Sequence, residues 1–140
     1  MKIGHAHLKV RNLERSIEFY EQVFGLKIRE RIGSFAFLSG TEMHHEIALQ
    51  EVGPEAQLPG RYDVGLFHVA FEVPDREALS ERYHYLRDHD ILVFPADHRI
   101  SLAIYFSDPD GNGLEIYCDT RHEIDGAEIW EGRDRRVGEL

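Results

Sequence analysis

The sequence has little of several features that define whole classes of protein. Its single cysteine, Cys118, excludes a disulfide framework and makes the cytoplasm the expected location. No stretch approaches the roughly 18 apolar residues of a membrane span, so no membrane partner is expected. The start, MKIGHAHLKV, lacks the apolar segment of a signal peptide. Basic residues are also few: 16 Lys and Arg against 26 Asp and Glu give a formal charge of −10, which argues against a nucleic-acid partner.

The remaining composition is ordinary except for one residue type. A chain of 140 residues with 42% hydrophobic and 30% charged side chains is typical of a single globular domain over residues 1–140. Nine histidines are unusual for this length. Histidine is the commonest metal ligand and the side chain that titrates near neutral pH. The placement of these histidines therefore decides whether they carry chemistry.

An internal repeat organises the chain. HAHLKVRNLERSIEFY begins at His5 and HVAFEVPDREALSERY begins at His68, an offset of 63 residues (68 − 5). Each copy opens with alternating polar and apolar residues, which predicts strands over 3–10 and 66–73. A helix-capping residue, Asn12 or Asp75, follows each strand, and apolar residues then recur at helical spacing, with Gly25 as the expected C-cap of the first helix.

Three further strands are expected after each helix. They fall at about 26–32, 35–39 and 43–51 in the first half, and at about 91–94, 102–107 and 113–118 in the second. The predicted fold is therefore α+β, with two βαβββ modules forming a curved mixed sheet around a metal-binding cleft. Module one covers about 3–51, a linker 52–65, module two about 66–118, and a charged tail 119–140.

Three polar residues share the strand faces that point away from the predicted helices. His5 and His68 open equivalent strands, and Glu115 lies between Leu114 and Ile116, which take the apolar face. Two imidazoles and one carboxylate on one side of an ion leave open coordination positions, an arrangement suited to Fe(II) or Mn(II). The alternative is that all three side chains are merely solvated, which their relation through the repeat disfavours.

The motifs HAHLKVRNLERSIEFYEQVFGL, FHVAFEV and YFSDPDGNGLEIY resemble those of the vicinal oxygen chelate superfamily over roughly residues 3–118. That superfamily includes glyoxalase I, extradiol dioxygenases and fosfomycin- and bleomycin-resistance proteins. The resemblance implies paired βαβββ modules around an open cleft. It also implies metal binding by His5, His68 and Glu115, and a small-molecule substrate with two adjacent oxygens.

Within the superfamily, the motifs are most similar to those of small two-module extradiol dioxygenase-like members. The resemblance implies that His45, in HHEIAL, handles protons and polarises bound oxygen. It further implies that Tyr105 hydrogen-bonds the substrate and that His98 helps to order the site. The implied activity is ring cleavage of a catechol-like substrate with Fe(II) and O2. Characterised extradiol enzymes usually have four modules, whereas this chain has two.

Two alternatives stay open at this point. A glyoxalase-I-like lyase or isomerase would use a fourth ligand, for which Glu46 is the candidate, although a shift of two residues puts Ala48 at that position. Zn(II) or Ni(II) would then replace Fe(II). The other alternative is a non-catalytic small-molecule binder of the resistance type, which the retention of all three ligands disfavours. Homodimers are common among two-module relatives, so a homodimer is expected.

Overall fold

The protein, described over residues 1–140 by a computed structural model, divides into two compact units. The first comprises Met1–Gly65 together with Asp108–Asn112, and the second comprises Leu66–Ser107 and Gly113–Leu140. Each unit contains one helix and one four-stranded mixed sheet in the order βαβββ, which confirms the predicted α+β class and the repeat.

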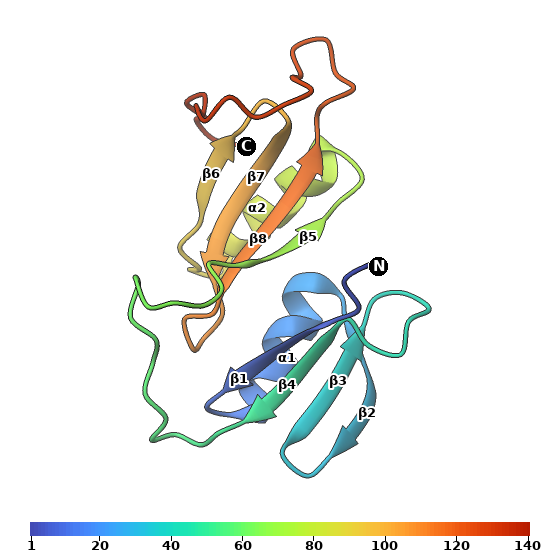
Figure 1. The fold of residues 1–140 in the computed structure, drawn as a ribbon, viewed down its shortest axis with the longest axis vertical. Helices are drawn as coiled ribbons and strands as arrows, with labels where there is room; N and C mark the ends of the chain where they lie inside the picture. The colour runs from blue at the N-terminus through green and yellow to red at the C-terminus, as the bar shows by residue number, and fades with distance from the viewer. The chain divides into compact units, whose positions relative to one another are not determined.

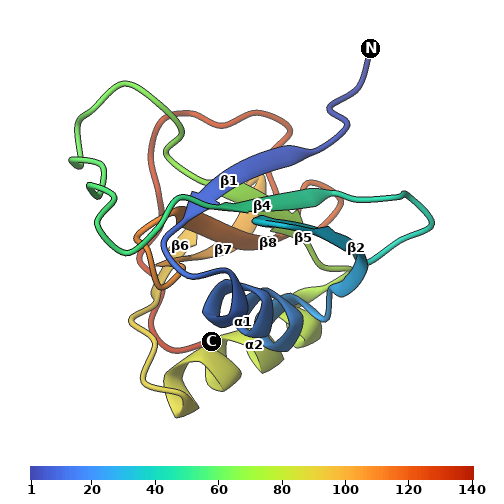
Figure 2. The same ribbon diagram turned by 90° about the horizontal axis from the view of Figure 1, so that it is seen from below.

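The first unit consists of β1 (Ala6–Val10), α1 (Leu13–Phe24), β2 (Lys27–Ile32), β3 (Phe35–Ser39) and β4 (Ile47–Glu51). Its strands lie in the order β1-β4-β3-β2, and the first pair is parallel. Helix α1 covers one face of this sheet (Figures 1 and 2). Alternate residues of β1, Leu8 and Val10, are buried, so the strand directs its apolar side chains into the core as expected.

Helix α1 begins and ends where its capping residues predict. The Asn12 side chain accepts a hydrogen bond from the Arg15 backbone N–H at 2.9 Å, which satisfies a donor that the first helical turn leaves free. Gly25 follows the last turn with a left-handed φ of 67°, a conformation that glycine adopts without steric cost. The buried face of the helix consists of Leu13, Ser16, Ile17, Tyr20 and Val23.

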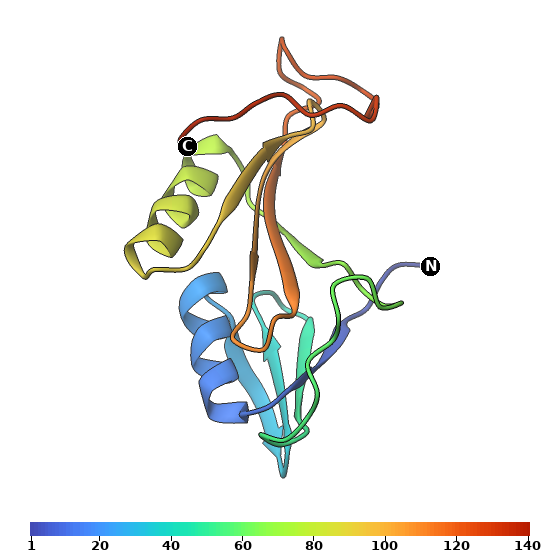
Figure 3. The same ribbon diagram turned by 90° about the vertical axis from the view of Figure 1, so that its left-hand side faces the viewer.

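The second unit consists of β5 (Val69–Glu72), α2 (Arg76–Asp88), β6 (Phe94–Asp97), β7 (Ser101–Ser107) and β8 (Gly113–Asp119). Its strands lie in the order β5-β8-β7-β6, and β5 is parallel to β8. Helix α2 lies against one face of the sheet (Figure 3). The unit's fully buried side chains include Leu79 and Leu86 from the helix and Ile104, Leu114 and Ile116 from the central strands.

Strand boundaries differ from the predicted ones at four places. β1, β4 and β5 begin at Ala6, Ile47 and Val69, later than the predicted 3, 43 and 66. The expectation of a strand at 91–94 was wrong, because β6 runs from Phe94 to Asp97. The Ile91 N–H still bonds to the Leu86 carbonyl at 2.9 Å, and Asp90 adopts a left-handed φ of 57°, so the helix termination occupies residues that the apolar pattern assigned to the strand.

The turn DPDGN between β7 and β8 is tied down by its own side chains. Asp108 Oδ1 accepts hydrogen bonds from the backbone N–H groups of Asp110 and Asn112, both at 2.9 Å, and the Asp108 N–H bonds to the Asn112 carbonyl. Residues 108–112 therefore form a tight turn before β8. Although sequence reasoning placed these residues in module two, they belong to the first unit, where the Tyr20 hydroxyl donates to Asp108 Oδ2 at 2.9 Å.

The segment after β8 contains no helix or named strand, yet it is attached to the second unit. The Ala127 N–H bonds to the Arg99 carbonyl at 2.9 Å, and the Arg135 N–H bonds to the Asp97 carbonyl at 2.8 Å. The tail thus runs past the ends of β6 and β7 (Figures 1 and 3). Neither α1 nor α2 has the length and apolar character needed to cross a lipid bilayer.

Candidate functional site

Two of the three predicted metal ligands meet in the second unit. His68 precedes β5, Glu115 lies on β8, and the parallel register pairs Ala70 with Glu115. This places Nε2 of His68 2.9 Å from Oε2 of Glu115. The Glu115 carboxylate is buried, whereas the His68 side chain is 37% exposed, so the pair has one side open to solvent.

A glycine keeps the two strands close enough for this pairing. A Cβ atom added at Gly113 would lie 1.8 Å from the Phe67 carbonyl oxygen and 3.3 Å from the His68 Cα. Real Cβ atoms do not approach backbone that closely, so any side chain at this position would push the start of β5 away from β8. The glycine in GNGLE is therefore a requirement of the site as well as part of a turn.

Tyr105 and His98 extend the pair into a larger cluster. Tyr105 lies directly opposite Glu115 in the antiparallel β7–β8 ladder, and its ring lies 5.4 Å from that of His68. Its hydroxyl is 2.8 Å from Nε2 of His98. Burial and the Glu115 carboxylate raise the pKa of Tyr105 above the ordinary phenol value of 10.0.

One member of this cluster was missed by sequence reasoning. Asp134, in the tail, places Oδ1 2.6 Å from Nδ1 of His98 and also accepts from the Trp130 indole N–H at 3.3 Å. The only hint in the sequence was the apolar pair Ile129 and Trp130, which predicts that the charged tail is anchored to the domain there. The cluster of the second unit thus comprises His68, Glu115, Tyr105, His98 and Asp134.

The remaining predicted residues, His5 and His45, are neighbours in the first unit. Their rings lie 4.5 Å apart, and the His45 ring also packs edge-on against Phe37 at 5.0 Å. Nδ1 of His45 lies 2.9 Å from Nδ1 of His44, so one of the two nitrogens donates and the other accepts. Burial, followed by the nearby imidazoles of His5 and His44, lowers the pKa of His45.

The strand register decides the question of a fourth ligand. In the first unit Ala6 pairs with Ile47 and His7 with Ala48, while in the second Val69 pairs with Leu114 and Ala70 with Glu115. Since Ala6 and Val69 each follow the equivalent histidines, Ala48 occupies the position that matches Glu115. The alignment that matched Glu46 with Glu115 is therefore wrong.

Glu46 instead closes the loop that leads into β4. Its carboxylate accepts hydrogen bonds from the Gly40 N–H at 2.8 Å, the Thr41 hydroxyl at 2.8 Å and the Ser39 hydroxyl at 3.2 Å. Burial acts to raise the pKa of Glu46, but these hydrogen bonds outweigh it and leave the pKa below the ordinary carboxyl value. The interactions of this glutamate are those of a structural residue.

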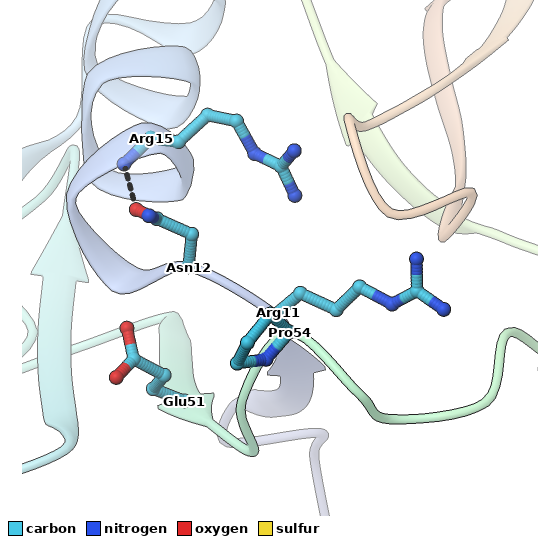
Figure 4. Close-up of a pocket in the computed structure, with 5 residues that line it drawn as sticks. All are labelled: Arg11, Asn12, Arg15, Glu51 and Pro54. Atoms are coloured by element: carbon cyan, nitrogen blue, oxygen red, sulfur yellow. Dashed lines mark hydrogen bonds between the residues drawn. The ribbon is translucent and has the colours of Figure 1, made fainter.

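A pocket at the start of α1 has a different character. Arg11, Asn12, Arg15, Glu51 and Pro54 line it (Figure 4). The polar groups around it already have partners: Glu51 accepts from the Leu13 N–H at 2.7 Å, and Arg11 donates to the Ala56 carbonyl at 2.8 Å. Arg15 is paired with Asp110. With Arg15 paired with a carboxylate, Arg11 bound to a carbonyl and the helix N-terminus capped, this pocket does not offer an anion site.

The donor set of the second unit fits a divalent metal. A carboxylate oxygen and an imidazole nitrogen 2.9 Å apart are a ligand pair that an ion can bind once the nitrogen carries no proton. Neither unit contains a group of three or more His, Cys, Asp or Glu side chains that could hold a metal ion by itself. The third predicted ligand, His5, belongs to the first unit, and the triad therefore remains a prediction.

The strands and motifs of both modules lie within a match to a known protein family. The profile of the Glyoxalase/Bleomycin resistance protein/Dioxygenase superfamily matches residues 2–116. The chain belongs to this superfamily. The profile match ends within β8, one residue beyond Glu115, so the tail that carries Asp134 lies outside the matched region.

Curated members of the superfamily that resemble the chain have different activities. It is 39% identical over 117 residues to a catechol-2,3-dioxygenase of Bacillus subtilis and 34% identical over 122 residues to biphenyl-2,3-diol 1,2-dioxygenase 3 of Rhodococcus globerulus. These matches cover 84% of the chain but only 41% and 63% of the two relatives. A metallothiol transferase FosB of Lysinibacillus sphaericus is 30% identical over 121 residues, which cover 84% of the chain and 82% of the relative.

Among solved superfamily structures, a possible glyoxalase from Bacillus cereus has the same fold. It superposes with a TM-score of 0.68 at 28% sequence identity, covering 84% of the chain and 99% of the other protein. The match thus takes in nearly the whole of a somewhat shorter protein.

Proposed function

We propose that the protein is an extradiol-type ring-cleavage dioxygenase that acts on a catechol-like substrate. In this proposal Fe(II) is held by His5, His68 and Glu115. Bound there, the ion would supply Lewis acidity toward two neighbouring hydroxyls and the redox capacity for reaction with O2. Superfamily membership and the 39% identity to a catechol-2,3-dioxygenase support the assignment.

The observation that carries the proposal is the connected cluster of the second unit. The ligand pair His68 and Glu115 adjoins Tyr105, whose hydroxyl contacts His98 at 2.8 Å. The resemblance to dioxygenases implied roles in the site for both Tyr105, which lies in strand β7, and His98, which lies in the loop before it. Their contact with each other beside a ligand pair favours this chemistry over a purely structural role for either residue.

The chain's own residues have distinct tasks in this proposal. The Tyr105 hydroxyl can hydrogen-bond a substrate hydroxyl, since a phenol can both donate and accept. His98 holds the Tyr105 hydroxyl in place. His45, beside His5, accepts the proton of a substrate hydroxyl and returns it later as a general acid.

A second candidate is suggested by the FosB relative. That match covers 82% of a metallothiol transferase, whereas the B. subtilis dioxygenase match covers 41% of its relative. Metal-dependent thiol transfer is therefore the alternative. The glyoxalase-like alternative is less well supported, because Ala48 occupies the position of the fourth ligand.

Oxygen uptake separates these candidates. The protein is purified without oxygen, reconstituted with Fe(II) and presented with a panel of catechols in an oxygen electrode. The proposal predicts uptake with at least one catechol, a strong reduction in Tyr105→Phe, and no change in Tyr62→Phe, whose ring is exposed. Absence of uptake across the panel, with a thiol added to an epoxide by ring opening in the presence of Mn(II), would instead support transfer.

The resemblance also implies a homodimer, and the single cysteine favours the cytoplasm. Light scattering coupled to size-exclusion chromatography tests the dimer, and a particle of 16.2 kDa would contradict it.

A further inference from the structure

The C-terminal tail brings a carboxylate to the far side of the His98–Tyr105 pair. Nδ1 of His98 lies 2.6 Å from Asp134 Oδ1, and Nε2 lies 2.8 Å from the Tyr105 hydroxyl. Three side chains from β7, the loop before it and the tail thus form one line: Asp134, His98, Tyr105. The His98 side chain is only 17% exposed, so its ring has little freedom to turn away from this line.

The tail is held at this place by several independent contacts. Two backbone hydrogen bonds, from Ala127 to Arg99 and from Arg135 to Asp97, flank Asp134 in sequence. The Trp130 ring packs edge-on to His98 at 6.0 Å, and its indole N–H donates to the same Asp134 oxygen. Asp134 is therefore held from both sides by contacts additional to its own contact with His98.

The chemistry of the contact determines the proton positions on His98. An ionised carboxylate can only accept hydrogen bonds, so Nδ1 of His98 must carry a proton. In the neutral imidazole Nε2 is then bare, and it accepts the proton of the Tyr105 hydroxyl. The reverse tautomer would donate from Nε2 to the Tyr105 oxygen and leave the phenol proton to point elsewhere.

The direction of that phenol proton matters because Tyr105 has a second acceptor close by. Tyr105 pairs with Glu115 across the β7–β8 ladder, and the Glu115 carboxylate lies within hydrogen-bonding reach of its hydroxyl. With Nε2 of His98 as its acceptor, the hydroxyl directs its proton away from the Glu115 carboxylate and turns an oxygen lone pair toward the site. With the reverse tautomer the proton is free to bond Glu115, which would compete with the ligand role proposed for that carboxylate.

We infer that Asp134 is a positioning residue: it fixes the Nδ1–H tautomer of His98 and so sets the direction of the Tyr105 hydroxyl. The tail beyond the matched region thereby contributes a residue to the site. The functional consequence rests on the proposed dioxygenase activity, whereas the tautomer itself does not.

The test is nitrogen-15 NMR of the histidine rings in the metal-free protein at a pH where His98 is neutral. His98→Gln identifies the His98 signals among the nine histidines. The wild-type spectrum should show a protonated Nδ1 and a bare Nε2 on His98. Asp134→Ala should lose this preference and populate the Nε2–H form.

Glu131→Gln is the matched control. Glu131 lies in the same tail and pairs with Arg99 at 3.6 Å, and it makes no contact with His98 among those described above. This variant should keep the wild-type tautomer. A proton on Nε2 in the wild type, an unchanged tautomer in Asp134→Ala, or the same change in both variants would overturn the inference.

Oxygen uptake of the Fe(II)-loaded protein then measures the functional consequence. Asp134→Ala should lower turnover about tenfold, the lower end of the cost of removing a carboxylate that orients a functional histidine. Since the NMR measurement needs neither metal nor substrate, a correct tautomer without any oxygen uptake would reject the dioxygenase proposal and leave the positioning role supported.

Discussion

His68 and Glu115 face each other across two parallel strands, with Nε2 of one 2.9 Å from Oε2 of the other. The two residues are far apart in the sequence. The distance between their side chains depends on the β5–β8 pairing and on its register. A register change of one residue would turn Glu115 toward α2 and bring Leu114 or Ile116 into its place. The backbone contacts that hold this register are therefore part of the site.

Gly113→Ala should disrupt both stability and metal binding. The added methyl group would lie 1.8 Å from the Phe67 carbonyl oxygen, and the backbone must move to accommodate it. A cost of about 1–3 kcal/mol in the free energy of unfolding is expected from such overpacking. Urea denaturation measures it, with Gly65→Ala as control, because a Cβ at Gly65 meets no atom within 4 Å. Equal effects of the two substitutions would contradict the close-approach argument.

Tyr20→Phe should destabilise the turn that precedes β8. Asp108 would keep its bonds to Asp110, Asn112 and the turn backbone but lose the buried hydroxyl donor. A hydrogen bond to a charged group contributes about 1.5–3 kcal/mol, so the free energy of unfolding should fall by that amount. Tyr62→Phe, in an exposed ring, should leave the stability unchanged.

The same tyrosine predicts a dependence on alkaline pH. Burial and the Asp108 carboxylate raise the pKa of Tyr20 above its ordinary value of 10.0. The folded state therefore holds this proton more tightly than the unfolded state, and the stabilisation present below pH 10.0 is lost as the pH rises further. The wild type should lose stability above pH 10.0 more steeply than Tyr20→Phe. Parallel curves would show that Tyr20 is not linked to Asp108 in solution.

Glu46→Gln should reduce stability without reducing metal binding. The amide offers one acceptor where the carboxylate accepts from Gly40, Thr41 and Ser39, so about 1 kcal/mol should be lost at neutral pH. Because the folded pKa is lowered, this stabilisation is present above the ordinary value of 4.5 and disappears as the pH falls through the folded pKa. The two denaturation curves should converge in acid. Loss of bound metal in this variant would instead restore Glu46 as a ligand.

The repeat and its capping residues made most of the fold predictable. Asn12, Asp75 and Gly25 mark helix termini by local chemistry, and the alternation in β1 and β8 depends only on which side faces the helix. The displaced start of β6 was not predictable from apolar residues alone. Hydrogen bonding of Ile91 back to Leu86 is a property of the helix end, which a run of aliphatic residues does not reveal.

The candidate site was predictable only in part. Within the second unit, the alternation of apolar and polar residues was sufficient to predict that His68 and Glu115 share one face of the sheet. The resemblance supplied His98 and Tyr105. The choice between Glu46 and Ala48 required the observed ladder register, because both alignments fit the apolar pattern. Asp134 could not be found, since it reaches His98 from 36 residues away through a tail without secondary structure.

The most direct test of the central claim is an anaerobic Fe(II) titration of the metal-free protein. The wild type should bind one ion per chain, and Glu115→Gln and His68→Gln should each lose tight binding. Glu72→Gln should bind as the wild type does, because its carboxylate lies on β5 near the Tyr117 hydroxyl rather than His68. Undiminished Fe(II) binding by Glu115→Gln and His68→Gln would contradict the proposed metal centre.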